Sequence, residues 1–255
     1  MSLKLFLLLF PLVIFAKGAS VEQLFSVQTI KVKKQSFQNK IRSYGYVKAD
    51  DSRKFSVSPR FGGFVVKLYA NKIYQRVKKG EALVSVYSPE ILKAKSEYLN
   101  TFNYAKKLPS RSMLESAKLK LKLLGISNRE INNIVKNKRV TPNTTIYSPI
   151  DGYIFTKNIQ NGSAFNAKAV LFEIINLDSV WVELKLLEEQ REFISSTNEY
   201  ELKFNGLNKI YYSKNKFLYP ELDPKVATLT MRLQVKNEDI ELFPGMYASV
   251  TSKQN

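Results

Sequence analysis

The sequence contains no cysteine and no histidine in its 255 residues. Without cysteine the chain has no disulfide framework, no thiolate zinc site and no cysteine nucleophile. Without histidine it lacks the usual general base near neutral pH and the commonest metal ligand. The two absences argue strongly against an enzyme, so we expect no catalytic residue, no cofactor and no metal site.

Acidic residues are also scarce. Only 22 aspartates and glutamates stand against 40 lysines and arginines, which gives a formal charge of +18. Hydrophobic residues make up 44% of the chain, close to the globular norm, and this share excludes a disordered chain and a multi-span membrane protein. The length allows one large domain or two to three small ones with cores of their own.

Residues 1–19 have the features of a secretory signal peptide. A lysine precedes an apolar run at residues 5–15, which Pro11 interrupts, and small residues follow. The run is too short to span a bilayer comfortably. We expect cleavage near Ala16 or Ala19 and export to the periplasm; an uncleaved N-terminal anchor is the alternative.

Export changes what the positive charge implies. Cleavage after residue 19 removes two lysines and leaves a charge of +16. A basic chain usually suggests nucleic acid, but an exported protein does not meet it, so we expect no nucleic-acid partner. An anionic membrane surface or an acidic partner protein is a better use of this charge. A solvated basic surface without a specific partner is the alternative.

The most informative feature is an internal repeat. Ser58–Val65 is similar to Ser148–Ile154, and Val77–Val86 is similar to Phe165–Ile174. Each copy predicts a Ser-Pro turn, a glycine, a strand, a second turn and a second strand. Because the order and the spacing agree, we interpret the copies as two halves of one sheet structure.

One position breaks this repeat. Gly80 occupies the second turn of the first half, whereas Lys168 occupies the matching turn of the second half. Glycine reaches left-handed backbone conformations without the penalty that a side chain brings. We therefore expect the turn at Lys168 to differ from the turn at Gly80.

Residues 88–141, between the two halves, predict three short antiparallel helices. Their starts are indicated by N-capping residues, namely Ser88 followed by Pro89, Ser112 in Ser-Met-Leu-Glu, and Ser127 in Ser-Asn-Arg-Glu. Leu108–Pro109 breaks the first helix, and Gly125 is the expected C-terminal cap of the second. Short helices must bury their apolar stripes against one another or against a partner.

The chain after the second half alternates apolar and polar residues. The alternation covers residues 180–186 and 200–204, Pro244–Gly245 has the residue order of a type II turn, and Tyr247–Val250 predicts a closing strand. Residues 30–48 also predict strands, which can pair with this region. An antiparallel barrel is the natural way to hide the edges of so many short strands.

Seven short motifs follow one another between residues 30 and 250. They are Ser58–Gly63, Val77–Gly80, Tyr87–Glu90, Leu124–Ser127, Ile146–Gly152, Leu177–Val182 and Phe243–Met246. In this order they resemble the periplasmic adaptor subunits of bacterial tripartite efflux pumps, also called membrane fusion proteins, of the hemolysin-D-like superfamily. The short three-helix insert is similar to that of adaptors of resistance-nodulation-division (RND) heavy-metal pumps, of the copper/silver or cobalt-zinc-cadmium type.

The resemblance implies a fold that is mainly β with an α-helical insert: a split lipoyl-like β-sandwich, a short three-helix insert and an antiparallel β-barrel. The implied division is residues 1–19 signal peptide, 20–57 N-terminal β segment contributing to the barrel, 58–87 and 146–176 lipoyl-like domain, 88–141 helical insert, and 177–255 β-barrel domain. Many relatives continue into a membrane-proximal domain, so we expect docking to the pump to use a reduced surface.

The resemblance also implies a non-catalytic role in heavy-metal cation efflux. The chain would link an inner-membrane RND transporter to an outer-membrane channel, assemble as a homo-oligomeric ring, and stay at the inner membrane through its pump. The candidate channel-facing tip consists of Lys106, Lys107, Leu108, Pro109 and Arg111. An exposed polar loop at these residues is the alternative.

Adaptors of the copper/silver type can hold the ion through methionines near the N-terminus, because thioethers suit soft cations. In this chain only Met113, Met231 and Met246 follow Met1, and they fall on separate predicted elements. We interpret all three as packing residues and assign no metal ligand.

Three other functions stay open from the sequence. An adaptor of a drug or ABC-type exporter would have a similar fold. A secreted lipoyl-like carrier would need a modified lysine between the two halves, where the predicted helices lie. A hydrolase would draw on carboxylates such as Glu188, Glu189, Asp223 and Glu241, but none of them comes with a partner motif.

Overall fold

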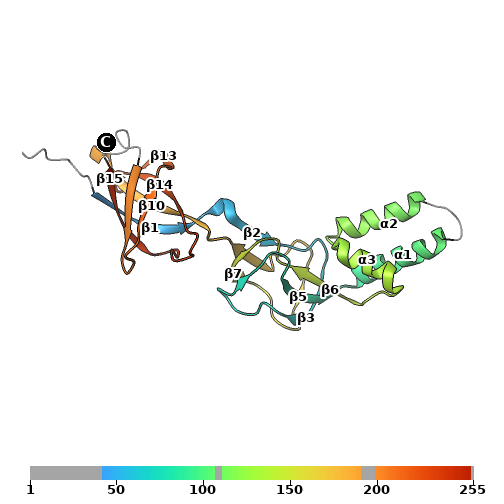
Figure 1. Cartoon of the computed structure of the whole chain (residues 1–255). Coiled ribbons are helices and arrows are strands. Elements are labelled where there is room, and N and C mark those ends of the chain that lie inside the picture. The colour runs from blue at the N-terminus through green and yellow to red at the C-terminus, as the bar shows by residue number, and fades with distance from the viewer. Residues whose placement is uncertain (1–41, 107–110, 191–198, 254–255) are drawn as a thin grey trace, which may run out of the picture. The chain divides into compact units, whose positions relative to one another are not determined.

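The computed structural model describes residues 42–106, 111–190 and 199–253 (Figure 1). The expected signal peptide, residues 1–19, lies outside these ranges. Three antiparallel sheets and three α-helices make up the described chain, which confirms the predicted fold class, mainly β with an α-helical insert. No helix in the described ranges is both long and apolar enough to cross a membrane.

One sheet has seven antiparallel strands. They are β1 (Arg42–Ala49), β10 (Ser179–Leu187), β11 (Glu199–Phe204), β12 (Ile210–Ser213), β13 (Lys216–Asp223), β14 (Thr228–Lys236) and β15 (Tyr247–Lys253), in the spatial order β12-β11-β15-β1-β10-β14-β13. In β10 the side chains of Val180, Val182, Leu184 and Leu186 are buried, and those between them are partly or fully exposed. This alternation is the one the sequence predicts for a sheet with one face on a core.

The two edge strands of the seven-stranded sheet, β12 and β13, are neighbours in the sequence, so the curl of the sheet brings its two edges near each other. Strand β12 ends at Ser213 and β13 begins at Lys216. The Ser213 hydroxyl donates a hydrogen bond to the carbonyl of Gln234 (2.7 Å), and the Gln234 N–H donates to the carbonyl of Asn215 (3.0 Å). These bonds join the β12 side of the sheet to β14 and reduce the exposed edge, as expected for a barrel.

Two four-stranded sheets form a sandwich in which the halves of the repeat interlock. The first half contributes β2 (Lys54–Val57), β3 (Gly63–Leu68), β4 (Arg76–Val77) and β5 (Ala82–Tyr87), and the second contributes β6 (Asn143–Tyr147), β7 (Gly152–Lys157), β8 (Ala164–Phe165) and β9 (Phe172–Ile175). The orders β2-β9-β7-β4 and β6-β5-β3-β8 become identical when each strand is exchanged for its counterpart in the other half. The sequence repeat is therefore a structural repeat, with Val65, Val84, Ile154 and Phe172 in a shared core.

The two matching turns share one backbone conformation, so the expectation of a different turn at Lys168 is wrong. The φ angle is +82° at Gly80 and +68° at Lys168. The N–H of Gly80 donates to the carbonyl of Ser148 (2.8 Å), and that of Lys168 donates to the carbonyl of Pro59 (2.7 Å). The tertiary bond holds Lys168 in a left-handed conformation that favours glycine.

The insert contains three α-helices, α1 (Pro89–Ala105), α2 (Arg111–Leu123) and α3 (Asn128–Asn137), and two short 3-10 helices lie elsewhere, η2 (Asp51–Arg53) and η3 (Glu188–Gln190). Ser88 and Ser127 cap α1 and α3 as predicted. The Ser88 hydroxyl accepts a bond from the N–H of Ile91 (3.5 Å), and the Ser127 hydroxyl accepts one from the N–H of Glu130 (3.2 Å). These caps satisfy N–H groups that have no partner within the helix.

Helix α2 begins earlier than predicted and ends as predicted. The start expected at Ser112 is wrong, because the helix already includes Arg111, a good helix former. At the other end Gly125 has a φ angle of +85°, and the N–H of Ile126 donates to the carbonyl of Leu121 (3.0 Å). This is the Schellman arrangement, which needs a left-handed residue at the position of Gly125.

Candidate functional site

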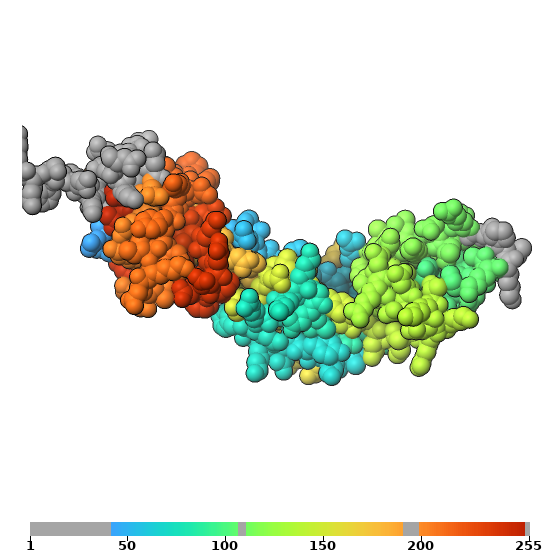
Figure 2. All heavy atoms as spheres, in the orientation of Figure 1, coloured from blue at the N-terminus to red at the C-terminus, as the bar shows by residue number. Residues whose placement is uncertain are grey.

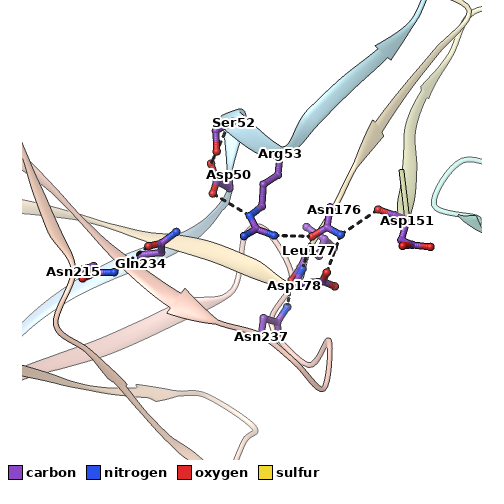
Figure 3. A network of polar contacts seen from close by, with 10 residues as sticks. All are labelled: Asp50, Ser52, Arg53, Asp151, Asn176, Leu177, Asp178, Asn215, Gln234 and Asn237. Atoms are coloured by element: carbon purple, nitrogen blue, oxygen red, sulfur yellow. Dashed lines mark hydrogen bonds and ion pairs between the residues drawn. The ribbon is translucent and has the colours of Figure 1, made fainter. Parts of the chain in front are cut away.

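One polar network lies where the chain crosses between the seven-stranded sheet and the sandwich. The chain makes this crossing at η2, between β1 and β2, and again at residues 176–178, between β9 and β10. Figure 3 shows polar side chains of both crossings turned toward one another. We call this set the crossing network, and its members are Asp50, Ser52, Arg53, Asn176, Asp178 and Asn237.

Asn176 connects the two crossings through its side chain. Its amide nitrogen donates to the carbonyl of Asp151 (3.2 Å) and to Oδ2 of Asp178 (2.8 Å). Its amide oxygen accepts from Nη1 of Arg53 (3.3 Å) and from the N–H of Asp178 (3.0 Å). The side chain therefore uses its full donor and acceptor capacity, which fixes its orientation.

Asp50 anchors the first crossing from a buried position. It accepts hydrogen bonds from the N–H (3.0 Å) and the hydroxyl (2.6 Å) of Ser52, and its Oδ2 lies 3.6 Å from Nε of Arg53. Burial raises the pKa of Asp50, but hydrogen bonds from Ser52 and Trp181 and the charge of Arg53 outweigh it, so the pKa lies below its ordinary value. Asp50 is thus a carboxylate throughout the physiological range.

Asn237 anchors the second crossing and is almost completely buried. Its amide nitrogen donates to the carbonyls of Leu177 (2.8 Å) and Leu242 (2.9 Å), and its amide oxygen accepts from the N–H of Leu242 (2.9 Å). A buried amide is tolerated only when its polar atoms are paired in this way. Asn237 therefore ties the crossing to the connection between β14 and β15.

A second network, the insert network, fixes the base of the helical insert. Lys95 on α1 has no exposed side-chain surface, and its Nζ lies 2.5 Å from Oε1 of Glu130 on α3. The same nitrogen donates to Oγ1 of Thr144 on β6 (2.7 Å) and to the carbonyls of Asn143 (3.1 Å) and Thr141 (3.3 Å). A buried ammonium group needs such compensation, so Lys95 joins two helices of the insert to the strand that follows them.

The key members of both networks were not predicted from the sequence. A signal for Lys95 was present, because it lies among Ile91, Ala94 and Tyr98 on the buried face of α1, where a lysine needs a partner. Nothing local marks Asn176, since Arg53, its partner in the other crossing, lies 123 positions away in the sequence. Within each network the polar groups bond one another's side chains and nearby backbone groups. The role of both networks is therefore to hold chain segments in place.

The candidate tip residues are only partly described. Lys106 follows the end of α1, with its Nζ 4.6 Å from the centre of the Phe102 ring, and Arg111 begins α2. The remaining members, residues 107–109, lie outside the described ranges. Helices α1 and α2 pack against each other, and a channel-facing role for the connection between them stays a prediction.

The three methionines lie on separate elements and in different surroundings. Met231 is fully buried in the core of the seven-stranded sheet, and Sδ of Met246 accepts a hydrogen bond from the N–H of Phe243 (3.2 Å). The packing role is wrong for Met113, whose side chain is 56% exposed on α2. In the part of the chain that the structure describes, no three acidic residues gather in a way that could hold a metal ion.

The carboxylates considered for hydrolase chemistry are not brought together as a site. Glu188 and Glu189 are exposed on η3, and Asp223 ends the edge strand β13. Glu241 accepts a hydrogen bond from the hydroxyl of Tyr211 (3.0 Å). Burial, followed by this bond and by the charge of Glu241, raises the pKa of Tyr211, which keeps the phenol protonated.

Comparisons with known proteins give the same architecture. The family described as "CusB, barrel-sandwich hybrid domain" matches residues 55–175, and the family described as "CusB-like, beta-barrel domain" matches residues 179–255. The first range covers the sandwich with its helical insert, and the second covers the strands after the second crossing. These two domains in succession define a membrane fusion protein. The chain belongs to the CusB-like membrane fusion proteins.

Individual relatives agree with this assignment. The chain is 28% identical over 193 residues to the membrane fusion protein SilB of Salmonella typhimurium, covering 75% of this chain and 44% of SilB. It is 27% identical to the cation efflux system protein CusB of Escherichia coli K12, covering 75% and 47%. The chain thus spans less than half the length of these relatives. The crystal structure of ZneB from Cupriavidus metallidurans has the same fold, with a TM-score of 0.55, 18% identity and coverage of 85% of this chain and 98% of ZneB.

Proposed function

We propose that the chain is a non-catalytic periplasmic adaptor that links an inner-membrane RND transporter to an outer-membrane channel for the efflux of heavy-metal cations. The observation that carries this proposal is the pair of CusB-like domains, with a three-helix insert between the halves of the sandwich. The relatives named as membrane fusion and cation efflux proteins share this part of the chain.

The proposal divides the work among the parts of the chain. The signal peptide at residues 1–19 directs export, the insert at residues 88–141 reaches toward the channel, and the sandwich and the barrel contact the transporter and neighbouring copies in a ring. Support comes from the two networks, which hold the chain at the crossings and at the base of the insert. Fixed connections suit a protein that transmits force and position between partners rather than one that does chemistry.

Deletion of the gene tests the proposed function. The deletion strain should become sensitive to at least one of copper, silver, zinc, cadmium, cobalt and nickel in graded growth assays, and the full chain supplied in trans should restore growth. The metal that inhibits growth identifies the exported cation. Unchanged growth on all six metals would contradict the proposal, and sensitivity to drugs or detergents alone would assign the adaptor to a drug exporter.

A further inference from the structure

Two loops occupy matching places in the halves of the sandwich. The first joins β3 to β4 and the second joins β7 to β8. The N–H of Tyr74 in the first loop donates to the carbonyl of Ile154 (2.7 Å), and the N–H of Gly162 in the second donates to the carbonyl of Val65 (2.9 Å). Because the acceptors are themselves counterparts on β7 and β3, the loops are held in the same way.

A second pair of bonds extends the match across each four-residue turn. In the first loop the N–H of Lys72 donates to Oε1 of Gln75 (3.3 Å). In the second, the N–H of Gln160 donates to Oγ of Ser163 (3.1 Å). We call the turns the 72–75 loop and the 160–163 loop. Their backbones are equivalent, so a difference in their side chains reflects a difference in use.

The 160–163 loop has the residues that this turn demands, whereas the 72–75 loop does not. The Asn161–Gly162 pair of the 160–163 loop is a common turn sequence, and Gly162 has a φ angle of +81°. Tyr74 occupies the equivalent position at +63°, a conformation that is strained for a bulky side chain. Its ring is fixed edge-on against Phe155, with the ring centres 5.4 Å apart. Strain that persists in a fixed place commonly marks a functional position.

The 72–75 loop also exposes its apolar side chains. Tyr74 is 68% exposed and Ile73 is 52% exposed, although both are large. The first half of the sandwich, which contains this loop, is coloured blue to cyan in Figure 2 and forms part of the surface on the side shown. At the same place the second loop has an asparagine and a glycine. The first half therefore presents a small apolar contact that the second half lacks.

The chain on both sides of this contact is rich in positive charge. Residues 67–79 contain five cationic side chains and no acidic one, whereas the matching residues 156–167 contain one lysine. The five are Lys67, Lys72, Arg76, Lys78 and Lys79. None of them forms an ion pair with another residue in the described ranges. Unpaired cations around an exposed aromatic group suit a negatively charged partner.

We propose that the 72–75 loop is a docking surface for an acidic face of a protein partner, with Ile73 and Tyr74 as apolar anchors inside a cationic rim. The strained backbone favours a protein over a lipid surface, because it fixes the direction of the Tyr74 side chain, which only a shaped partner can use. A preorganised aromatic anchor beside arginine is the composition found at the centres of protein interfaces. The inference rests on the proposed function, since the partner to be tested is the transporter.

A loop graft separates docking from folding. The quadruple variant Lys72→Gln, Ile73→Asn, Tyr74→Gly, Gln75→Ser gives the first loop the sequence of the second, so its melting temperature should equal or exceed that of the wild type. Its affinity for the RND transporter of the same organism, purified into nanodiscs and measured by biolayer interferometry with the full chain, should fall by about 30-fold or more. The matched control Lys168→Gln, which removes one charge from the other half, should bind within about twofold of the wild type.

The outcomes separate this inference from the proposed function. A wild-type chain that does not bind the transporter would contradict the proposed function and the docking surface with it. A wild-type chain that binds, with a graft that binds equally well, would overturn the docking surface alone, as would a control that is weakened as much as the graft. Loss of graft binding to phosphatidylglycerol vesicles, with transporter binding unchanged, would identify the loop as a membrane contact and overturn the protein-docking proposal.

Discussion

Lys168 shows a single residue held by its surroundings in a conformation that its own side chain disfavours. Lys168→Gly should raise the free energy of unfolding by about 0.5–1 kcal/mol, because relief of left-handed strain exceeds the added flexibility of the unfolded chain. Gly80→Ala is the mirror experiment: its new Cβ meets no atom within 4 Å, so the backbone alone should cost about 1 kcal/mol. Urea denaturation measures both variants. A Lys168→Gly protein that is no more stable than wild type would show that the turn is unstrained.

Asp50 makes the stability of the protein depend on pH. Its pKa is lower in the folded chain than the ordinary value of 3.8, so its ionised form stabilises the fold above that value, and the contribution is lost as pH falls through the lower, folded-state pKa. Asp50→Asn should therefore destabilise the protein at pH 7, and the difference in unfolding free energy between variant and wild type should narrow as the pH falls below 3.8 and through the folded-state pKa. Urea unfolding at a series of pH values checks this. A constant gap would mean that hydrogen-bond geometry, and not charge, is what matters at Asp50.

The residues that could be predicted from the sequence are those whose partners are close along the chain. Ser88 and Ser127 were found because an N-cap bonds an N–H three positions away. Lys95 bonds groups 46 to 49 positions away, and Asn237 bonds a carbonyl 60 positions away. No local pattern reports such contacts, since the fold must bring the segments together first. This is why the caps were predicted and the networks were not.

At the scale of elements, the insert network decides how firmly the helices are attached to the sandwich. Glu130→Ala leaves the Lys95 ammonium buried without its carboxylate and should destabilise the protein by about 3–5 kcal/mol. The double variant Lys95→Met, Glu130→Gln removes the charge as well and should recover most of that loss. The exposed pair of Lys120 and Glu97 is the control, because Glu97→Ala should cost less than about 1 kcal/mol. Equal losses in all three, measured by urea unfolding, would contradict a special role for the buried pair.

The connection between α1 and α2 carries a prediction about export. Reversal of charge at Lys106, Lys107 and Arg111 to glutamate should weaken metal export while leaving the melting temperature unchanged, because the described members of this set are exposed at helix ends. Growth of the complemented deletion strain on the exported metal measures the effect. Reversal of three exposed charges elsewhere, at Lys48, Lys93 and Lys225, provides the control. Export that is as strong with the tip variant as with the control would contradict a channel-facing role for these residues.

Element boundaries could be predicted where the conformational preferences of the turn residues agree with the packing. They could not be predicted where a tertiary hydrogen bond holds a turn residue in a conformation that it disfavours. The repeat, the insert and the alternation in β10 follow from hydrophobic spacing, which the core then satisfies. The turn at Lys168 was mispredicted because a bond to Pro59 outweighs the preference of a lysine. No prediction was made for Tyr74, whose left-handed conformation is likewise held by a bond from its N–H to the carbonyl of Ile154. At both positions the backbone preference of the residue conflicts with the conformation that the fold imposes. One of the two, Tyr74, lies on the proposed docking surface.

At the scale of the whole molecule the positive charge is unevenly distributed. Residues 51–176, which contain the sandwich and the insert, have 22 basic and 8 acidic residues and so contribute 14 of the 18 net charges. Residues 177–255 have 10 basic and 12 acidic residues. Residues 1–50 have 8 basic and 2 acidic residues. The part that holds the 72–75 loop and the candidate tip therefore has most of the basic excess of the described chain, and residues 177–255 are close to balanced.

This distribution predicts how salt acts on assembly. The association rate constant of the full chain with its transporter should fall about tenfold or more between 50 and 500 mM NaCl, because screening weakens long-range attraction to an acidic partner, while the dissociation rate should change less. Lys225→Glu, in the part of the chain with balanced charge, should leave the salt dependence unchanged, whereas Lys72→Glu should reduce it. Stopped-flow or surface-based kinetics with the transporter in nanodiscs gives both rates. An association rate that is independent of salt in the wild type would show that the charge of the sandwich and the insert is solvated and guides no partner.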